Sequence, residues 1–298
     1  MNSDLLVLDK QKPNINAQIS PNDAANQSIK KIGIIAGGGN FPKEIIELCH
    51  KNKIDLFVIA FEGETDSAIL ENIEHEWVEL GKIGKWIKIL KKQKITDILL
   101  AGNIKRPSIT NFKIDFQGAK LLTKIIGSKK QGDNSLFTKI ISFLEDNGFN
   151  ILNIMEHFPS LFVESGVLTD SKPDNRALDD IDIGKNVIKS LSQSDVGQSV
   201  IVQRGMVIGI EAVEGTDQLI KRCGDLQDEG SKAGILVKMR KIQQDNRIDL
   251  PTIGINTIEN CYKNNIRGLA LETGSVVIIN KDVVINRANQ LGMFITGV

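Results

Sequence analysis

The sequence predicts an α/β protein with a helix-covered parallel sheet in its N-terminal half and a mixed α/β domain in its C-terminal half. From residue 31 onward, short apolar runs alternate with amphipathic helical patterns. This pattern lapses at residues 159–177, which contain two prolines and show little periodicity. We therefore expect a flexible extension over residues 1–30, a first domain over 31–158, an inter-domain linker over 159–177 and a second domain over 178–298.

The first half opens with a βαβ unit. A short buried strand is predicted at 32–36 and a second strand at 55–60. Between them, residues 41–50 form an amphipathic helix, and Pro42 suits its first turn. Further elements are predicted at 83–92 (helix), 97–102 (strand), 116–126 (helix) and 134–147 (helix). Such alternation places a parallel sheet between helices, so residues 31–158 are predicted to form a Rossmann-like domain.

The second half mixes hairpin and crossover patterns. The dipeptide Arg204-Gly205 stands between two alternating β-rich runs, which predicts a hairpin. The other predicted elements are helices at 183–191, after 217, at 256–265 and at 281–292, and strands at 234–238, 268–272, 276–279 and 293–298. This order predicts a mixed α/β domain with its own core.

Composition and charge exclude several classes of protein. Of the 298 residues, 41% are hydrophobic and 25% are charged, which is typical of a globular protein. Lys plus Arg and Asp plus Glu both number 37, so no net field favours a nucleic-acid partner. The cysteines, Cys49, Cys223 and Cys261, are far apart and odd in number. They argue against a disulfide framework or a zinc cluster and for a reducing compartment.

Residues 1–30 are rich in Asn, Gln, Asp and Ser and lack the basic start and apolar centre of a signal peptide. No stretch of the chain approaches the roughly 20 apolar residues that a membrane helix needs. We therefore expect a cytoplasmic protein that is at most attached to a membrane surface.

Glycines stand directly between the first predicted strand and the first predicted helix. In A-G-G-G-N-F-P at 36–42, backbone N–H groups and the helix N-terminus could receive a phosphate. The dinucleotide fingerprint G-x-G-x-x-G would need a glycine in place of Pro42, although Glu62 lies about where a ribose-binding acid is found. A tight turn without a ligand is the alternative.

A second loop, A-G-N-I-K-R-P at 101–107, follows another predicted strand of the same sheet. Ligands of open α/β sheets bind outside the carboxyl ends of the strands, so Asn103 and Arg106 are expected to face the same crevice as the glycines. Arginine offers a forked grip on phosphate oxygens. The alternative is an ordinary loop with a solvated arginine.

Acidic residues gather in I-E-A-V-E-G-T-D at 210–217, where a strand is predicted to end and a helix to begin. Glu211, Glu214 and Asp217 recur at spacings of three around a glycine. These acids could bind a divalent cation, or Thr216 and Asp217 could simply cap the helix. The sequence leaves both readings open.

Another carboxylate, Asp249, sits between Ile248 and Leu250 in R-I-D-L-P-T-I-G. The following Pro251 biases Leu250 to extended geometry, which fixes how the carboxylate is presented. A carboxylate between aliphatic residues has either a partner or a function. No H-E-x-x-H, nucleophile-elbow or Walker pattern occurs, so any catalysis is predicted to depend on carboxylates and a metal ion.

The motifs point to one family when they are taken together and in order. They are A-G-G-G-x-x-P, A-G-N-x-x-R-P, G-D-N-S-L-F, G-Q-S-V-I-V, I-E-A-V-E-G-T-D, L-V-K and R-I-D-L-P-T-I-G. In combination they closely resemble the LpxI-type UDP-2,3-diacylglucosamine pyrophosphatases of lipid A biosynthesis, from about residue 31 to the last residue. The resemblance implies a cytoplasmic, metal-dependent hydrolase with a nucleotide-binding first domain and a catalytic second domain.

The resemblance also implies a reaction. UDP-2,3-diacylglucosamine is cleaved into UMP and 2,3-diacylglucosamine 1-phosphate, known as lipid X, by water that attacks the phosphorus on the sugar side. The family's essential aspartate lies in R-x-D-L-P-T, which makes Asp249 the catalytic residue, as a base or as a metal ligand. Mg²⁺ or Mn²⁺ is the implied cofactor, and its candidate ligands are Asp249, Glu211, Glu214 and Asp133. Family members often have two successive acids where this chain has Asp133 and Asn134, and Asn134 supplies no charge.

The same matching implies a substrate site in a cleft between the two domains. Its candidate residues are Gly37, Gly38, Gly39, Asn103, Arg106, Gly215, Thr216, Asp217, Lys238 and Thr252. The apolar stretch at 158–168 is either a surface for the acyl chains or inter-domain packing. Transient contact with the inner-membrane surface and a homodimer are further expectations.

Two other classes of protein stay open from the sequence. An NAD(P)-dependent oxidoreductase would use the glycine loop and Glu62, but Pro42 interrupts its fingerprint. A non-catalytic sugar-nucleotide-binding module would keep the loops and could dispense with Asp249.

Overall fold

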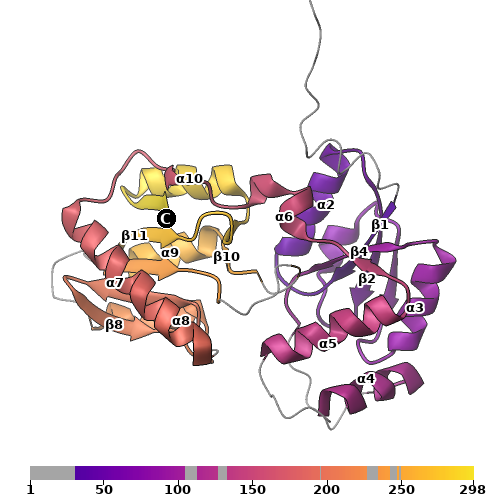
Figure 1. Cartoon of the computed structure of the whole chain (residues 1–298). Coiled ribbons are helices and arrows are strands. Elements are labelled where there is room, and N and C mark those ends of the chain that lie inside the picture. The colour runs from indigo at the N-terminus through magenta and orange to yellow at the C-terminus, as the bar shows by residue number, and fades with distance from the viewer. Residues whose placement is uncertain are drawn as a thin grey trace, which may run out of the picture.

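The computed structural model describes residues 31–104, 113–126, 133–194, 196–226, 234–241, 247 and 250–298. These residues form two α/β units, each with its own large sheet (Figure 1). The predicted fold class is confirmed, because the N-terminal unit has a parallel sheet with helices and the C-terminal unit a mixed sheet. The extension predicted over residues 1–30 lies outside the described residues.

The first sheet is parallel throughout and has the order β3-β2-β1-β4-β5. The elements of this unit are β1 (Lys31–Ala36), α2 (Phe41–Lys51), β2 (Asp55–Phe61), a 3-10 helix (Ser67–Leu70), β3 (His75–Val78), α3 (Ile83–Lys92), β4 (Asp97–Ala101), α4 (Phe116–Ile126), α5 (Asp133–Asp146), β5 (Asn150–Ile151), α6 (Ile154–His157) and a second 3-10 helix (Pro159–Leu161). The chain builds outward from β1 to β3 on one side and then crosses to β4 on the other. The switch point of this Rossmann-like topology therefore lies between β1 and β4, where ligands of such sheets bind.

Two apolar cores cover the opposite faces of this sheet. Ile34 of β1 packs with Ile45 of α2 in one buried cluster, whereas Ile35 packs with Leu90 of α3 in the other. Successive strand residues face opposite sides, so a strand buried at five of its six positions needs cover on both faces. Figure 1 shows α2 and α6 on one side and α3, α4 and α5 on the other.

The edge strand β3 was not predicted from the sequence. It arises from E-H-E-W-V, where His75 lies in a run of charged residues. Among the described residues the strand pairs with β2 alone, at the edge of the sheet, and Val78 is its one fully buried residue. Exposed edge strands carry charged side chains, so the apolar alternation that marks a strand is absent here.

The second sheet has the order β6-β13-β11-β9-β7-β8. Its unit contains β6 (Gly166–Val167), α7 (Asn175–Leu191), a 3-10 helix (Ser192–Ser194), β7 (Ser199–Gln203), β8 (Met206–Ile210), α8 (Thr216–Gly224), β9 (Gly234–Lys238), β10 (Thr252–Ile253), α9 (Ile255–Lys263), β11 (Ile266–Leu271), β12 (Val277–Ile278), α10 (Lys281–Gln290) and β13 (Phe294–Gly297). Strands β9, β11 and β13 are parallel, and β7 runs antiparallel to β8 and β9. Ile181 of α7 packs on one face, whereas Leu219 of α8, Ile258 of α9 and Val284 of α10 pack on the other.

The hairpin predicted at Arg204-Gly205 is confirmed. These residues have φ angles of 50° and 79°, the pair of positive values that a tight two-residue hairpin requires. The carboxylate of Asp180, 3% exposed on α7, accepts hydrogen bonds from both N–H groups at 3.0 and 2.6 Å. A buried acid thereby satisfies the turn and ties it to the helix.

Helix α7 begins inside the segment that was predicted as a linker. It starts at Asn175 because the Asp174 carboxylate caps it, accepting from the N–H of Ala177 at 2.8 Å. The same carboxylate accepts two hydrogen bonds from Arg267 at 2.8 and 2.7 Å. The Arg267 guanidinium, together with the cap, holds the pKa of Asp174 well below its usual range. The helix predicted at 183–191 is thus the second half of a longer one.

The chain passes from one unit to the other at Phe162 and Val163. Phe162 is buried in the first unit's core, and Val163 in the second unit's core. Val277 of β12 pairs with Phe162 in an isolated bridge and packs in the first unit's core as well. The N–H of Asn280 donates to the Glu44 carboxylate of α2 at 3.1 Å, and burial raises the pKa of Glu44. The two units are therefore joined by an apolar contact.

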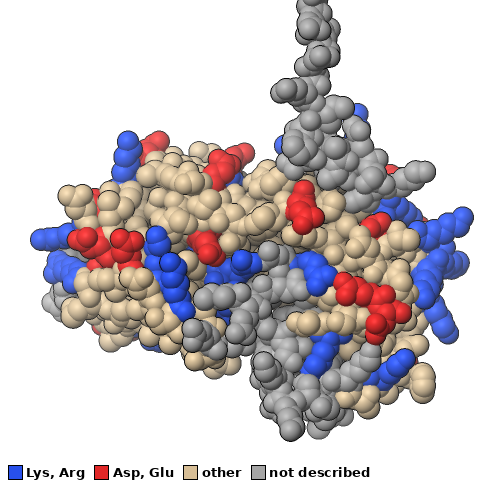
Figure 2. Space-filling model, in the orientation of Figure 1, with Lys and Arg blue, Asp and Glu red and all other residues tan. Residues whose placement is uncertain are grey.

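The described surface carries charges of both signs. Lys and Arg are interspersed with Asp and Glu over both units on the face in Figure 2, in keeping with the equal totals of the two signs. Within the described ranges, no helix combines the length and the apolar character that crossing a bilayer requires.

Candidate functional site

The glycine loop and the A-G-N loop lie side by side at the carboxyl ends of β1 and β4. Gly38 and Asn103 form an isolated antiparallel bridge, with N···O distances of 2.7 and 3.1 Å in its two directions. The N–H of Gly37 donates to the carbonyl of Ala101, the last residue of β4, at 2.8 Å. The structure therefore brings both loops together at the switch point of the sheet. Arg106 lies outside the described residues.

The backbones of the glycine loop and the A-G-N loop approach so closely that several positions in them have no room for a side chain, which explains why they are glycines. A Cβ on Gly37 would lie 2.5 Å from the carbonyl oxygen of Asn103, and one on Gly102 would lie 2.5 Å from that of Gly38. Gly39 and Gly102 also have φ angles of +84° and +88°, in the region that favours glycine. The tight turn and the phosphate-binding reading are compatible, because the turn holds the loop at the ligand-binding edge of the sheet.

Thr65 ties the glycine loop to the loop after β2. Its hydroxyl donates to the carbonyl of Ala36, the last residue of β1, at 2.6 Å and accepts from the N–H of Phe61 at 2.9 Å. Thr65 is 8% exposed. The carbonyl oxygen of Glu64 lies 3.1 Å from where a Cβ on Gly38 would stand. Thr65 therefore joins the ends of two adjacent strands just before the glycines.

The features of a dinucleotide site are incomplete in this unit. Glu62 follows β2 directly and is exposed, as a ribose-binding acid would be. Pro42, however, is buried in the first turn of α2, where the fingerprint needs a glycine.

Four polar side chains meet at the carboxyl end of β9 in the second unit. They are Ser199 at the start of β7, Glu211 after β8, Thr216 at the start of α8 and Lys238 at the end of β9. The Lys238 Nζ lies 2.7 Å from the Thr216 hydroxyl and 3.2 Å from the Ser199 hydroxyl. The Thr216 hydroxyl in turn lies 3.0 Å from the Glu211 carboxylate. Ser199, Lys238 and Glu211 are 0%, 2% and 6% exposed, so this is a buried network.

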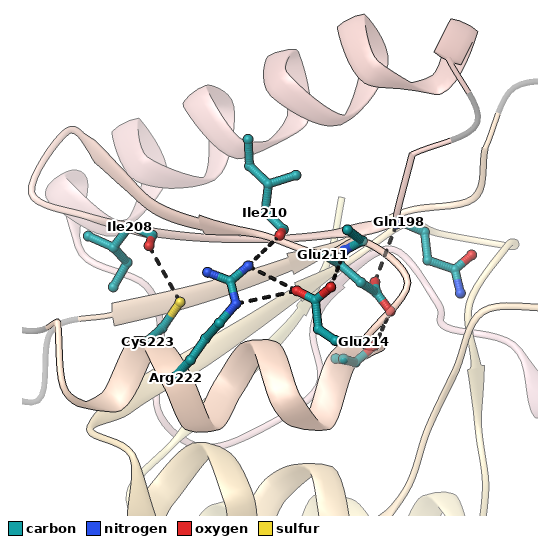
Figure 3. Close-up of polar contacts among 9 residues, drawn as sticks. Gln198, Ile208, Ile210, Glu211, Glu214, Arg222 and Cys223 are labelled. Atoms are coloured by element: carbon teal, nitrogen blue, oxygen red, sulfur yellow. Dashed lines mark hydrogen bonds and ion pairs between the residues drawn. The ribbon is translucent and has the colours of Figure 1, made fainter.

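Glu211 and Glu214 point to different partners (Figure 3). The second oxygen of Glu211 accepts from the N–H of Gln198 at 3.3 Å. One oxygen of Glu214 accepts from Arg222 Nη2 at 3.0 Å, and the other accepts from the N–H of Ala212 at 3.2 Å. Hydrogen bonding from its own N–H and from Arg222 lowers the pKa of Glu214. The two carboxylates are thus engaged separately.

The capping alternative for the acidic stretch is wrong. The N-cap of α8 is Gly215, with a φ angle of 81°, so the capping position has no side chain that could accept from the helix. Thr216 is the first helical residue, and its hydroxyl is bonded to Glu211 instead. The Asp217 carboxylate accepts a hydrogen bond from the Asn260 side chain at 3.1 Å.

The metal site stays a prediction. Among the described residues, no group of three or more His, Cys, Asp or Glu side chains is placed to hold an ion. Asp133 is the first residue of α5, but its side chain lies outside the described residues, as does Asp249.

Residues on both sides of Asp249 contact the first unit. Arg247 Nη1 lies 2.7 Å from the Glu145 carboxylate of α5. Leu250 packs against the first unit's core. Thr252 begins β10, and its hydroxyl donates to the carbonyl of Leu250 at 2.8 Å. The R-I-D-L-P-T motif therefore belongs to the second half of the chain, yet it reaches the first unit through its flanks.

Sequence reasoning missed two residues of these networks. Ser199 lies in the motif G-Q-S-V-I-V, but the motif alone assigns no role to its hydroxyl. Thr65 belongs to no motif, and only its position after a strand at the ligand edge could have marked it.

These features define a class of protein with two α/β units, ligand-type loops at the switch point of a Rossmann-like sheet, and a buried lysine and glutamate at strand ends of the second sheet. The chain belongs to the LpxI family: the model of the LpxI N-terminal domain matches residues 31–161, and that of the LpxI C-terminal domain matches residues 164–296. It is 30% identical over 275 residues to the UDP-2,3-diacylglucosamine pyrophosphatase LpxI of Caulobacter vibrioides. That match covers 91% of this chain and 98% of the relative, so the resemblance seen in the motifs is confirmed.

Proposed function

We propose that this protein is an enzyme that hydrolyses the pyrophosphate bond of UDP-2,3-diacylglucosamine in lipid A biosynthesis. The products are UMP and 2,3-diacylglucosamine 1-phosphate, lipid X. The observation that carries the proposal is the match of both units to the LpxI family, with a relative of that named activity aligned over 91% of the chain. The joined loops at the carboxyl ends of β1 and β4 support a nucleotide site in the first unit.

The two units have different tasks in this proposal. The loop of Gly37, Gly38 and Gly39, with Asn103 and Arg106, takes the nucleotide side of the substrate. Gly215, Thr216, Asp217, Lys238 and Thr252 serve the diphosphate from the second unit. The buried charge of Lys238 supports this division, because a fixed positive charge favours a diphosphate at that edge.

Asp249 acts on the attacking water. The water oxygen forms a bond to the phosphorus on the sugar side, the bond from that phosphorus to the bridging oxygen breaks, and UMP leaves with that oxygen. Asp249 takes the proton that the water loses. The contacts of Arg247 and Leu250 with the first unit support a site to which both units contribute.

Activity is expected to need Mg²⁺ or Mn²⁺, which would neutralise the diphosphate. The described carboxylates do not by themselves fit such an ion. The oxygens of Glu211 and Glu214 accept hydrogen bonds from N–H and O–H donors, so an ion there would have to displace them. Magnesium is often held by one or two carboxylates and substrate phosphates, which leaves Asp249 and Asp133 as the candidate ligands.

The lipid character of the substrate indicates where in the cell the enzyme acts. A diacylated sugar nucleotide is expected to be met at the cytoplasmic face of the inner membrane through transient contact of the enzyme with the lipid surface. The apolar stretch at 158–168 is less available for acyl chains than the sequence suggested, because Phe158, Leu161 and Phe162 are buried in the core. A homodimer stays an expectation.

The decisive experiment incubates the purified protein with UDP-2,3-diacylglucosamine and Mg²⁺ in ¹⁸O-labelled water. UMP should form without label, and lipid X should carry one ¹⁸O in its phosphate. Exhaustive chelation should stop the reaction, and added Mg²⁺ or Mn²⁺ should restore it. Label in UMP would contradict the direction of attack, and full activity after chelation would contradict the metal requirement.

The same sample separates the two rival classes. A non-catalytic sugar-nucleotide-binding module would bind the substrate but release no UMP. An NAD(P)-dependent oxidoreductase would bind the nicotinamide cofactor at the glycine loop, which equilibrium dialysis with NAD and NADP measures directly.

A further inference from the structure

The hydrogen bonds around Thr216 have one consistent direction. A lysine ammonium can only donate, so the Thr216 oxygen, 2.7 Å from Lys238 Nζ, must accept. The hydroxyl has a single proton, and the Glu211 carboxylate 3.0 Å away accepts it. Donation therefore runs from Lys238 through Thr216 to Glu211. The Ser199 hydroxyl also lies 3.3 Å from the Thr216 oxygen, and because the single Thr216 proton is given to Glu211, Ser199 is the donor in that contact.

This relay explains how a lysine charge is kept inside the second unit. Lys238 is 2% exposed and Glu211 is 6% exposed, so both charges have lost most of their hydration. Burying a charge is costly unless it is paired and hydrogen-bonded. One shared hydroxyl lets the two opposite charges compensate each other, while the Ser199 hydroxyl at 3.2 Å gives the ammonium a second acceptor.

The relay lies at the end of β9, the strand that precedes the R-I-D-L-P-T motif in the sequence. The carbonyl of Lys238 accepts from the N–H of Glu272, which follows β11, at 3.0 Å. The Glu272 carboxylate accepts from the N–H of Arg240 at 2.8 Å. Backbone and side chain of this strand end are thus both fixed, at the edge of the parallel strands where ligands bind.

We infer that Glu211 and Thr216 are positioning residues that hold the buried ammonium of Lys238 in the place from which its charge stabilises the bound diphosphate. The inference rests on the proposed function. It gives Glu211 a role other than the metal ligand expected from the sequence, and it means that the Thr216 hydroxyl orients Lys238 instead of donating to the substrate.

Kinetics of three variants test this role. Thr216→Val removes the hydroxyl at nearly constant shape, Thr216→Ser keeps it, and Glu211→Gln removes the charge that orients it. The diphosphate is anionic both before and during the reaction, so the lost interaction should weaken both states. Thr216→Val and Glu211→Gln should raise KM about tenfold to a hundredfold with kcat within about threefold, and Thr216→Ser should stay close to wild type.

The matched control is Thr169→Val. Thr169 is a buried threonine of the second unit, and its hydroxyl donates to the carbonyl of Ser171 and accepts from the N–H of Ile295 at 3.1 and 2.9 Å. Its loss should lower stability without changing KM. The double variant Glu211→Gln/Thr216→Val should be no worse than the poorer single variant, because both changes break one chain.

A second readout does not depend on the substrate. In the ¹⁵N-lysine-labelled protein, assigned by the variant Lys238→Arg, the Lys238 ammonium should give a slowly exchanging signal. Thr216→Val and Glu211→Gln should shift or broaden this signal. Thr216→Ser keeps the hydroxyl and should leave the signal as it is in the wild type. If the wild type failed to hydrolyse the substrate while these signals behaved as stated, the proposed function would fail and the relay would stand.

Three results would overturn the inference. They are an unchanged Lys238 signal in both Thr216→Val and Glu211→Gln, kinetic constants of these variants that match those of Thr169→Val, and losses that add in the double variant. Should Thr216→Val not fold, Glu211→Gln and Thr216→Ser still decide the outcome.

Discussion

At the scale of single residues, Asp249 makes the sharpest prediction. Asp249→Asn keeps the shape but removes the base, and Asp249→Ala removes both, so each should lower kcat far more than tenfold while folding and substrate binding persist. Stopped assays for UMP measure the loss, and circular dichroism checks the fold. Retention of more than about a tenth of the activity, a loss of under roughly 1.4 kcal/mol, would contradict the catalytic role.

The concentration of Mg²⁺ separates the two roles of Asp249. If the residue served mainly as a metal ligand, excess Mg²⁺ would recover much of the activity of Asp249→Asn. For a base, saturating Mg²⁺ should leave that activity low.

Thr65 is the second test at this scale. Thr65→Val should lower the free energy of unfolding by about 1–2 kcal/mol, because the N–H of Phe61 and the carbonyl of Ala36 lose a buried partner. KM should rise too, since the glycine loop begins at the next residue after Ala36. Thr65→Ser keeps the hydroxyl and should recover most of both values in urea titrations and initial-rate assays. A Thr65→Val protein with lowered stability and unchanged KM would limit Thr65 to a structural role.

At the scale of secondary-structure elements, the start of α7 depends on Asp174. Asp174→Ala should lower the free energy of unfolding by about 1 kcal/mol, because it removes the cap on Ala177 and the pairing with Arg267. Asp174→Asn keeps a capping oxygen and should lose less, since an exposed ion pair contributes little.

The pH dependence of this element follows from the direction of the pKa shift. The pKa of Asp174 is depressed in the folded protein. The contribution of its carboxylate to the free energy of unfolding is therefore complete above the unfolded pKa of roughly 3.9, and it is lost as the pH falls below that value. The stability difference between wild type and Asp174→Ala should therefore shrink in acid unfolding titrations below about pH 4. A difference that stays constant down to pH 2 would contradict this assignment.

The predictable elements were the strongly periodic ones. The strand at 32–36 and the helix at 41–50 lie within one residue of β1 and α2, because their apolar spacing reflects burial on known faces. In contrast, β5 has only two residues, which are too few to show a period. Helix α7 begins earlier in the chain than the predicted start at residue 183. Its capping residue, Asp174, is held by Arg267, which is distant in sequence, and no local pattern reveals this contact.

The candidate site likewise has features that the sequence predicts and features that it does not. The meeting of the glycine and A-G-N loops could be predicted, because parallel strands end at one edge of a sheet. The relay of Glu211, Thr216 and Lys238 could not, because the hydrogen-bond partners of Thr216 depend on strand register and on where α8 begins.

At the scale of the whole molecule, the apolar contact at Phe162 makes the units depend on each other. Phe162→Ala should lower the free energy of unfolding by about 3–5 kcal/mol and should split one thermal transition into two in calorimetry. Phe57→Ala is the control, because Phe57 is equally buried but lies in the core on the other face of the first sheet. It should lower stability without uncoupling the units. A single transition in Phe162→Ala would mean that the units are held together by other contacts.

The position of β13 has a consequence for synthesis on the ribosome. This strand, Phe294–Gly297, lies between β6 and β11, so the second sheet cannot reach its final order until these residues have emerged from the ribosome. The first unit's own strands and helices emerge much earlier, and domains generally fold as they emerge. Its core nevertheless contains Val277, which is translated long after residues 31–161. Until Val277 emerges, a nascent chain therefore exposes an unfinished apolar surface, which is the kind of surface that chaperones recognise.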